Sequence, residues 1–323
     1  MDKNIYYKVL DHGFISAIDW MGNDHDIAEA ARCSVGGGFS CKNKDDRELI
    51  RYLMRHSHFS PMEMAEVKFH VAMPIFVARQ QVRHRTCNFS EHSSRYSEMP
   101  QVYFLPDKWR EQSKVRIQGS SNEEINPISQ ELLKRDSEDL QHRANQLYKL
   151  KLQSGLSREL ARTDIPISIY TMMYIKCDLR NWLHFLELRL DSHAQYEIRE
   201  YAKMIASYIQ HLFPITWEAF SDYILFGQKF SRQELCLIKS MDGDWQDCIA
   251  NKKDSMPPHY DILQKRSKEL GMTKLEFEEF WEKYASTNNN VAKITSIGLL
   301  PILSKDEILK KYYPQNDKPK DNQ

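Results

Sequence analysis

Alternating hydrophobic and polar residues predict strands in the first quarter of the chain. Residues 5–20 alternate loosely and contain Gly13, a pattern typical of a strand or a hairpin. Residues 65–71 alternate strictly, with Val67 and Phe69 on one face. Because successive side chains of a strand point to opposite faces, this second segment predicts a half-buried strand.

Helical periodicity, with apolar residues three or four positions apart, is the commoner pattern elsewhere. A helix capped by Asp24 is expected to end near Cys33, and Pro61 is expected to stop the next one. Pro74 is expected to begin a helix that runs through Arg85. The periodicity predicts helices at residues 24–33, 45–57, 75–85, 129–154, 157–162, 179–190 and 214–224.

Other segments have less regular patterns. Residues 167–177, ISIYTMMYIKC, fit a buried strand or a buried helix, and periodicity does not separate the two. Residues 97–128 are polar and contain three prolines, which predicts an inserted or mobile loop. Beyond residue 225, helical stretches are expected near residues 232–239, 261–270, 274–284 and 305–311, followed by a disordered tail at 314–323.

The composition is that of a soluble globular protein with one large domain or two. The chain has 323 residues, 41% of them hydrophobic and 28% charged. Its 45 lysine and arginine residues balance 45 acidic ones, which argues against binding to nucleic acid or to a membrane surface. There is no apolar run of about 18 residues, and the first residues lack the apolar core of a signal peptide.

The cysteines and glycines exclude several kinds of site. Six cysteines are scattered without a CxxC pair, which favours reduced thiols in the cytoplasm over zinc ligands or disulfides. No Lys-Ser/Thr pair follows Gly36–Gly38, so this run predicts a flexible loop rather than a phosphate loop. The chain also lacks a GxGxxG motif, so no Rossmann site is expected. No metal site is expected either, given the scattered cysteines.

A local excess of positive charge stands out against this neutral background. Residues 79–96, RQQVRHRTCNFSEHSSRY, hold four arginines, two histidines and one acid, Glu91. Arginine donates hydrogen bonds in pairs and keeps its charge, so it binds phosphate well. Ser90, Ser93 and Ser94 add hydroxyl donors. The segment predicts a site for a phosphorylated small molecule, although a solvated basic helix end would carry the same charges.

The spacing inside this segment is specific. Arg83-His84-Arg85 is followed by seven residues and then by Ser93, a signature that resembles the flavin-dependent thymidylate synthases, the ThyX family. The sequences LIRYLMRHSHFSPMEMAEVKFHVAMPIFVARQ before it and DLRNWLHFLELRLDSHAQYEIREYA after it are also similar to that family. The resemblance covers roughly residues 5–225, with an insertion at about 97–128, and leaves 226–323 as a helical extension of unknown role.

The resemblance implies a fold and an activity. It implies an α+β fold, in which helices flank an antiparallel sheet, and it favours a helix at residues 167–177. It further implies FAD-dependent reductive methylation of dUMP to dTMP, with methylenetetrahydrofolate as carbon donor and NADPH as reductant. A homotetramer with sites shared between subunits is implied as well. In such an enzyme the protein binds and orients while the cofactor supplies the chemistry.

The resemblance also assigns site residues, position by position. Arg189 would be the catalytic residue, because it would contact the uracil edge and stabilise developing charge. The residues that would bind dUMP are Gln80, Gln81, Val82, Arg83, Glu91, His92, Ser93, Ser94, Arg95, Arg162 and Arg189. Those that would bind FAD are His58, Ser60, Arg83, His84, Arg85, Glu91, Asp178, Leu179, Arg180 and His184.

The residues themselves support a ligand role for Arg189. In the expected helix at 179–190 it lies beside Trp182 and Phe185, away from the leucine stripe of that helix. An arginine among aromatic side chains is costly to bury without an acceptor, so it must face a ligand or extend to water.

Four positions qualify this assignment. Asp178 stands where the family often has Asn, and a carboxylate cannot donate an amide N–H to the flavin. Met64 stands where relatives often have His. Neither Cys87 nor Ser93 has an identified activating base, so neither is expected to act as a nucleophile.

Two other functions fit the same residues. The scaffold could make another 5-substituted deoxyuridylate. Alternatively, the Arg83-His84-Arg85 cluster could belong to a non-catalytic nucleotide- or RNA-binding module, and the lack of a wider basic surface counts against that interpretation.

Overall fold

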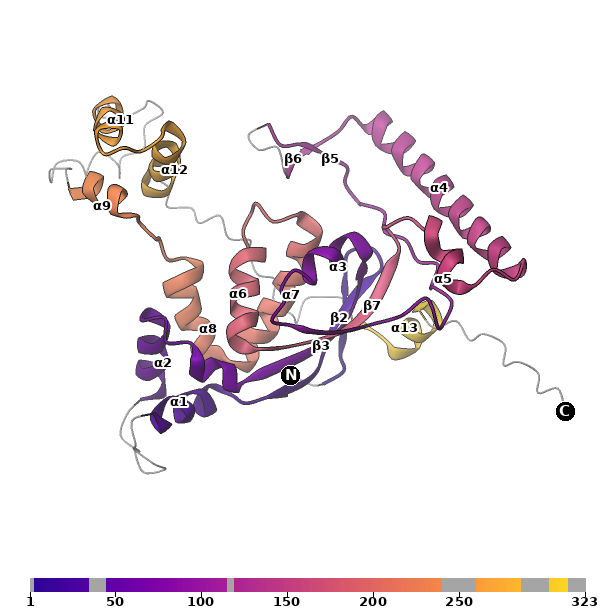
Figure 1. Ribbon diagram of the computed structural model, residues 1–323, viewed down its shortest axis with the longest axis horizontal. Helices are drawn as coiled ribbons and strands as arrows, with labels where there is room; N and C mark the ends of the chain where they lie inside the picture. Colours follow the sequence, from indigo (N-terminus) through magenta and orange to yellow (C-terminus); the bar gives the residue numbers. More distant parts are fainter. Residues whose placement is uncertain (1–2, 35–44, 115–118, 240–259, 286–301, 313–323) are drawn as a thin grey trace. The chain divides into compact units, whose positions relative to one another are not determined.

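The computed structural model describes residues 3–34, 45–114, 119–239, 260–285 and 302–312 (Figure 1). The chain divides into two compact units. The first comprises Met1–Phe220 and Ala292–Gln323, and the second comprises Ser221–Val291. The glycine run at residues 36–38 and the tail at 314–323, for which we predicted a flexible loop and disorder, lie outside the described residues.

An antiparallel six-stranded sheet is the centre of the first unit (Figure 1). The predicted strand or hairpin near the start of the chain is confirmed as two paired strands, and the strand predicted at 65–71 is present as well. The α+β class is therefore confirmed. In spatial order the strands are β4 (Asn88–Glu91), β7 (Tyr170–Asp178), β3 (Glu66–Pro74), β2 (Gly13–Met21), β1 (Tyr6–Val9) and β8 (Ile302–Leu303).

Two helices cover one face of this sheet. The ring of Trp182 in α6 (Leu179–Arg189) lies 5.1 Å from the ring of Phe69 in β3. The ring of Tyr208 in α7 (Tyr196–Leu212) lies 5.4 Å from the same ring. The leucine stripe predicted for α6 is fully inside the core, which is why this helix packs flat on the sheet. Its members are Leu179, Leu183, Leu186 and Leu190.

The opposite face is partly covered by the C-terminal helix α13 (Lys305–Tyr312). Ala72 lies three positions after Phe69 in β3, so the two side chains point to opposite faces. Around Ala72, Tyr312 and Ile308 of α13 join a core cluster that includes Phe14. Because β3 is covered on both faces, it is buried from Phe69 onward, and the prediction of a half-buried strand is wrong there.

Residues 170–178 form strand β7, so the helix favoured for 167–177 is wrong. β7 pairs with β3 along its whole length and with β4 along residues 173–176. Residues 170–173 are buried on both faces of the sheet, so the first half of β7 has no two-residue alternation, whereas burial alternates from Tyr174 onward. The β-branched and aromatic content of the segment was the correct signal.

The start of α1 (Asp24–Cys33) differs from the prediction. Asn23 caps this helix, whereas the carboxylate of Asp24 is turned towards α8 (Pro214–Phe220). It accepts hydrogen bonds there from two backbone N–H groups and from the Thr216 hydroxyl, at 2.7–3.0 Å. Asp24 therefore caps α8 rather than its own helix, and α1 is held to a segment far along the chain.

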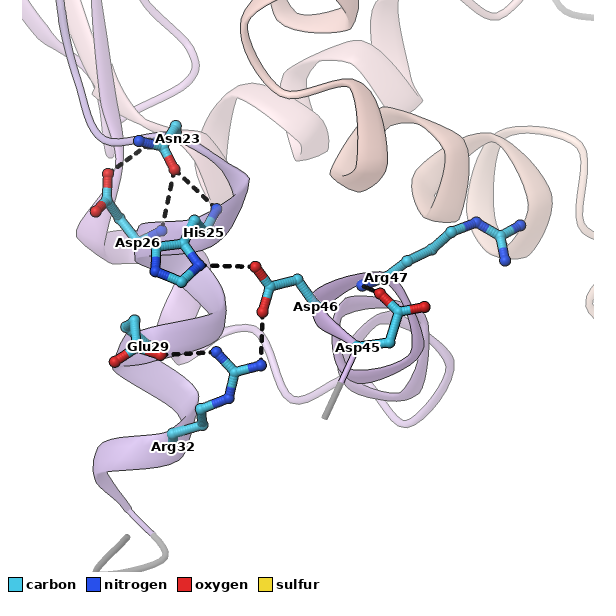
Figure 2. A network of polar contacts seen from close by, with 8 residues as sticks. All are labelled: Asn23, His25, Asp26, Glu29, Arg32, Asp45, Asp46 and Arg47. Carbon is cyan, nitrogen blue, oxygen red and sulfur yellow. Dashed lines mark hydrogen bonds and ion pairs between the residues drawn. The ribbon is translucent and has the colours of Figure 1, made fainter. Parts of the chain in front are cut away.

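A polar network joins α1 to α2 (Asp46–Arg55), and Figure 2 shows it. Asp46 accepts from Nδ1 of His25 at 2.8 Å and from Arg32 at 2.5 Å, and Arg32 also bonds to Glu29 at 2.7 Å. The Asp46 carboxylate raises the pKa of His25. His25 is exposed, so its contact adds little to stability, whereas the Arg32 side chain is buried and depends on its two carboxylate partners.

The end of α2 also differs from the prediction. The helix ends at Arg55, and the left-handed backbone of Ser57 (φ 58°) breaks it well before Pro61. Pro61 lies instead in the first turn of a 3-10 helix, η1 (Ser60–Met64), where its missing N–H leaves no bond unmade.

Residues 97–128 contain more structure than the predicted loop. Backbone hydrogen bonds of 2.8 Å tie residues 102–104 to residues 168–170 at the start of β7. A small separate sheet follows, formed by β5 (Arg110–Gln112) and β6 (Ser120–Glu124). Both strands are short and polar, so they leave no hydrophobic alternation in the sequence.

The two helices expected after this region are present. α4 (Pro127–Gln153) is followed by Gly155, which has a φ of 81° and ends the helix as predicted. α5 (Arg158–Ala161) and the 3-10 turn η2 (Arg162–Asp164) lead from there to the main sheet.

The second unit is helical and has its own core. Its elements are the π-helix η3 (Ser221–Leu225), α9 (Arg232–Lys239), α11 (Tyr260–Glu269) and α12 (Lys274–Ala285), which confirm the helical stretches predicted there. Its core residues are Leu237, Leu263, Met272, Phe277 and Phe280. Within the described ranges, no helix is long and apolar enough to cross a membrane.

Candidate active site

The Arg83-His84-Arg85 signature lies in a turn. α3 (Ile75–Gln81) ends before it, so the prediction that the helix carries the signature is wrong. The turn is closed by hydrogen bonds from His84 N to the Gln81 carbonyl and from Cys87 N to the His84 carbonyl, each 3.1 Å long. Because β4 begins at Asn88 and must reach β7, the chain has to leave the helix here.

Arg83 and Arg85 flank His84 in this turn, and both are exposed. In the described part of the chain, neither guanidinium takes part in an ion pair or a hydrogen bond. Two guanidiniums that are separated by one residue and have free N–H donors can bind an anionic ligand.

His84 points the other way, into the protein. Its ring lies 4.8 Å from Phe185, and its Nε2 accepts a hydrogen bond of 3.1 Å from Nε of Arg189. Burial, with a smaller effect of the Arg189 and His184 charges, lowers the pKa of His84 to about 4. The imidazole is therefore neutral near pH 7, which lets Nε2 act as the acceptor for Arg189.

Arg189 ends α6 and is half-buried. Its neighbours in the predicted helix, Trp182 and Phe185, are buried, and burial lowers the pKa of Arg189 itself. With His84 as its acceptor, the guanidinium meets the requirement for a partner and still has donors to spare.

Arg189 and Gln80 line one cavity of about 730 Å³. Its other walls include Phe76, the β5–β6 hairpin and residues 192–195. The hairpin is held to α7 by Arg110, whose guanidinium lies 3.8 Å from the ring centre of Tyr196. A volume of this size accommodates a ligand as large as a nucleotide.

Gln80 and Gln81 differ in their surroundings. Gln80 donates a hydrogen bond to Gln195 at the cavity wall, whereas Gln81 is fully buried. Among the described residues, neither the oxygen nor the nitrogen of the Gln81 side-chain amide has a hydrogen-bond partner. An unpaired buried amide costs about 1–3 kcal/mol, and such groups occur at binding sites. Val82, next along the chain, is exposed.

A second group of predicted residues gathers where β4 ends. The buried hydroxyl of Ser94 accepts from Arg162 at 2.9 Å, and Glu91 accepts from the Thr171 hydroxyl at 2.7 Å. Nε2 of His92 lies 2.7 Å from the Ser97 hydroxyl, and burial lowers the pKa of His92. Ser93 and Arg95 complete the group, so its donors are arginines and hydroxyls, as a phosphate requires.

The start of α6 forms a third group. Asp178 caps the helix, with its carboxylate accepting from Asn181 N at 2.9 Å and from Asn181 Nδ2 at 2.7 Å. Arg180 pairs with Glu63 of η1. The Leu179 side chain is fully buried, and its backbone N–H donates to the Ala65 carbonyl at 2.8 Å.

Three further positions border this third group or the turn. His58 precedes Ser60 and η1, and its ring lies 6.0 Å from that of Tyr52. The ring of His184 lies 6.3 Å from that of His84. Met64, the other position that departs from the family pattern, has an exposed side chain.

Comparisons with known proteins decide the family. The chain matches the family described as thymidylate synthase complementing protein over residues 17–215. It is 45% identical over 240 residues to a flavin-dependent thymidylate synthase of Ehrlichia ruminantium (strain Gardel), covering 73% of this chain and 79% of that protein. A protein of the same name from Thermus thermophilus is 42% identical over 241 residues, with 75% and 87% covered. The chain belongs to the flavin-dependent thymidylate synthase family.

A solved structure agrees with this membership. The chain resembles a UMP/dUMP methylase, PolB from Streptomyces cacaoi, bound with 5-Br UMP, with a TM-score of 0.60 and 31% identity. The match covers 68% of this chain and 98% of that one. The likeness to a flavin-dependent thymidylate synthase, stated above from sequence motifs, is therefore confirmed for both sequence and fold.

In this flavin-dependent thymidylate synthase, predicted site residues gather in separate groups. The structure brings Gln80, His84 and Arg189 together, and it brings Ser94 and Arg162 together. Among the described residues, no hydrogen bond or ion pair joins these two groups. The role of each residue stays a prediction.

The sequence did not indicate the walls of the cavity. Phe76 and Gln195 line it, as do residues of the β5–β6 hairpin. Gln195 falls within DSHAQ, a run that carries the resemblance and could have been included on that ground. The hairpin left no signal, because its position depends on the Arg110–Tyr196 contact rather than on a motif.

Proposed function

We propose that this enzyme methylates dUMP to dTMP, with FAD as cofactor, methylenetetrahydrofolate as carbon donor and NADPH as reductant. The observation that carries the proposal is the turn at residues 83–85. It presents two unpaired guanidiniums outward and a neutral histidine inward, bonded to Arg189. Family membership supports the rest of the proposal.

The residues present fit a flavin nucleotide. Arg83 and Arg85 are free to bind its phosphates. At the start of α6, the N–H groups of Leu179 and Asn181 already donate to the Ala65 carbonyl and to the Asp178 carboxylate, so the arginines would be the main phosphate ligands. Asp178 already uses its carboxylate oxygens as the helix cap, so we expect it to shape the site rather than to donate to the flavin. Bound FAD would carry electrons from NADPH to the reaction.

Arg189 would act on the pyrimidine. Its Nε donates to His84, which fixes the direction of the guanidinium, and the residue lines the cavity together with Gln80. Donors directed at a uracil oxygen stabilise negative charge that develops on the ring. Because the arginine is half-buried, this interaction is stronger than it would be in water.

The nucleotide phosphate would bind elsewhere, at Ser93, Ser94, Arg95 and Arg162. Family membership supports a homotetramer with sites shared between subunits. We include that assembly in the proposal. The cytoplasmic location expected from the cysteines stays a prediction.

The test is a titration of the purified protein with FAD, followed by product analysis. We expect flavin absorption to remain with the protein after gel filtration, and dTMP to form from dUMP, methylenetetrahydrofolate and NADPH. A parallel reaction with UMP is included because the similar structure is that of a UMP/dUMP methylase. A different 5-substituted product would point to the second enzyme function considered above. A protein that stays colourless with excess FAD would contradict the proposal.

A further inference from the structure

Helix α4 is almost entirely exposed. Tyr148 is the buried residue among its 27 positions. Leu140 and Leu150 are 60% and 58% exposed, and Leu132, Leu133 and Leu147 are exposed as well. A helix in water depends on packing of an apolar face, and a row of exposed leucines of this length marks a surface that binds another protein.

One side of α4 is held by its own subunit. Nε2 of Gln141 donates to the Phe104 carbonyl at 3.1 Å, and the Tyr148 hydroxyl accepts from Met99 N at 3.3 Å. Gln141 and Tyr148 are seven residues apart, so they lie on one side of the helix.

The adjacent side carries the leucines at the spacing of a coiled coil. Leu133, Leu140 and Leu147 recur every seven residues, with the small residues Ser137 and Ala144 between them. This leucine stripe lies beside the side that packs on the subunit, so it remains open to a second helix.

The charges of α4 are divided between its two halves. Residues 128–139 hold four acids and two bases, whereas residues 140–153 hold three bases and no acid. A parallel copy would place like charges together. A reversed copy places the acidic half against the basic half, which is the complementary arrangement.

From this stripe and this charge division, we infer that α4 pairs antiparallel with α4 of a second copy, about a twofold axis near Leu140. Leu140 of the two copies then meet, and Leu133 of each copy faces Leu147 of the other. Asp136 and Arg143 border the stripe on the same side, so Asp136 of each copy comes beside Arg143 of the other. The inference rests on the proposed self-association and not on the flavin chemistry.

The pairing has a consequence for the nucleotide site. Lys151, near the end of α4, forms an ion pair with Asp164 of η2, two residues after Arg162. Arg162 in turn bonds to Ser94. A partner bound along α4 therefore steadies the segment that presents the predicted phosphate ligands.

The test uses the full-length protein and its mass in solution by sedimentation velocity. We expect Leu140→Glu to raise the dissociation constant of self-association at least 10-fold, so that the assembly falls to half its mass or less. The matched control is His142→Glu, which adds the same charge to an exposed position two residues away from the stripe. It should leave the mass unchanged. Circular dichroism checks that both variants keep their helix content.

Reversal of the charges beside the leucine stripe gives a second test of the pairing. Asp136→Arg and Arg143→Asp should each weaken self-association several-fold, and the double variant should restore it, because the two sites are reversed together. A Leu140→Glu protein with wild-type mass and affinity, or a double variant weaker than both singles, would overturn the inference. FAD binding measured in the same samples separates failure of this interface from failure of the proposed function.

Discussion

At the scale of single residues, the candidate site depends on one neutral histidine. His84 accepts from Arg189, and this bond fixes the direction of a guanidinium that has no carboxylate partner in the described structure. Burial keeps His84 uncharged, which avoids placing two cations 3.1 Å apart.

Replacing Arg189 tests this arrangement. We expect Arg189→Ala to lower kcat by about 10²–10³-fold, as loss of a charge-stabilising donor does elsewhere. FAD content should stay close to wild type, because Arg189 is assigned to the pyrimidine. Arg189→Lys should also be poor, since an ammonium cannot bond to His84 and to a ligand oxygen in the same planar geometry. Near-normal turnover of the lysine variant would contradict the role proposed for Arg189.

A second histidine makes stability depend on pH. His70 is buried in the sheet and stacks on Tyr174, with ring centres 4.5 Å apart, and burial lowers its pKa to about 4. Its folded pKa is below its unfolded value, so between about pH 6.5 and 4 the unfolded chain binds more protons. Stability should therefore fall as pH is lowered through that window.

Urea unfolding at pH 7.5 and at pH 5 measures this effect. His70→Phe keeps a ring of similar shape but cannot be protonated, so it should lose less stability than the wild type on going to pH 5. The control is His142→Gln, a change at an exposed histidine. Equal losses in the wild type and in His70→Phe would show that His70 is not the source.

At the scale of elements, distant segments are joined by a few buried polar contacts. Asp24, at the first position of α1, caps α8, which lies about 190 residues further along the chain by sequence numbering. The cap satisfies donors at the start of α8 that have no partner within that helix.

Removing the Asp24 carboxylate should therefore loosen α8. We expect Asp24→Ala to lower the free energy of unfolding by about 2–3 kcal/mol, because hydrogen bonds to a buried charged acceptor are lost. Asp26→Ala is the matched control: it removes an exposed carboxylate in the same turn, and we expect a loss of about 1 kcal/mol or less. Turnover per folded molecule should be unchanged in both. A cost for Asp24→Ala no larger than for Asp26→Ala would show that the cap contributes little.

At the scale of the whole molecule, the C-terminal extension is divided between the two compact units. Residues 305–312 return to the first unit, where Tyr312 and Ile308 complete a core cluster. The Tyr312 hydroxyl also donates to the His12 carbonyl at 2.5 Å. The second unit has a core of its own.

A chain ending at residue 227 tests whether the extension contributes to stability alone or also to catalysis. Every residue with a predicted role lies between His58 and Arg189, so we expect the shortened protein to keep FAD binding and dUMP-dependent NADPH oxidation. It should unfold at a lower temperature, because it lacks α13. Tyr312→Ala in the full chain should reproduce most of that loss, at about 3 kcal/mol. A shortened protein that is folded and FAD-loaded but inactive would show that the extension supplies a catalytic group.

The sequence by itself determined the features that depend on local chemistry. Apolar periodicity located α2, α4 and α6, and the leucine stripe of α6 predicted its buried side. The Arg83-His84-Arg85 spacing indicated the family, because a ligand site needs particular side chains in a fixed order. These properties are set by residues close together in the chain.

Only the tertiary structure decided what depends on distant partners. Residues 170–178 are a strand because β3 and β4 pair with them on both sides, which no local pattern shows. Asp24 caps α8 rather than α1 because that helix start lies beside it in the fold. His84 is a neutral acceptor because Phe185 and Arg189 enclose it, and this enclosure exists once α6 packs against the turn. Burial and long-range pairing set these outcomes, and both arise when the chain folds.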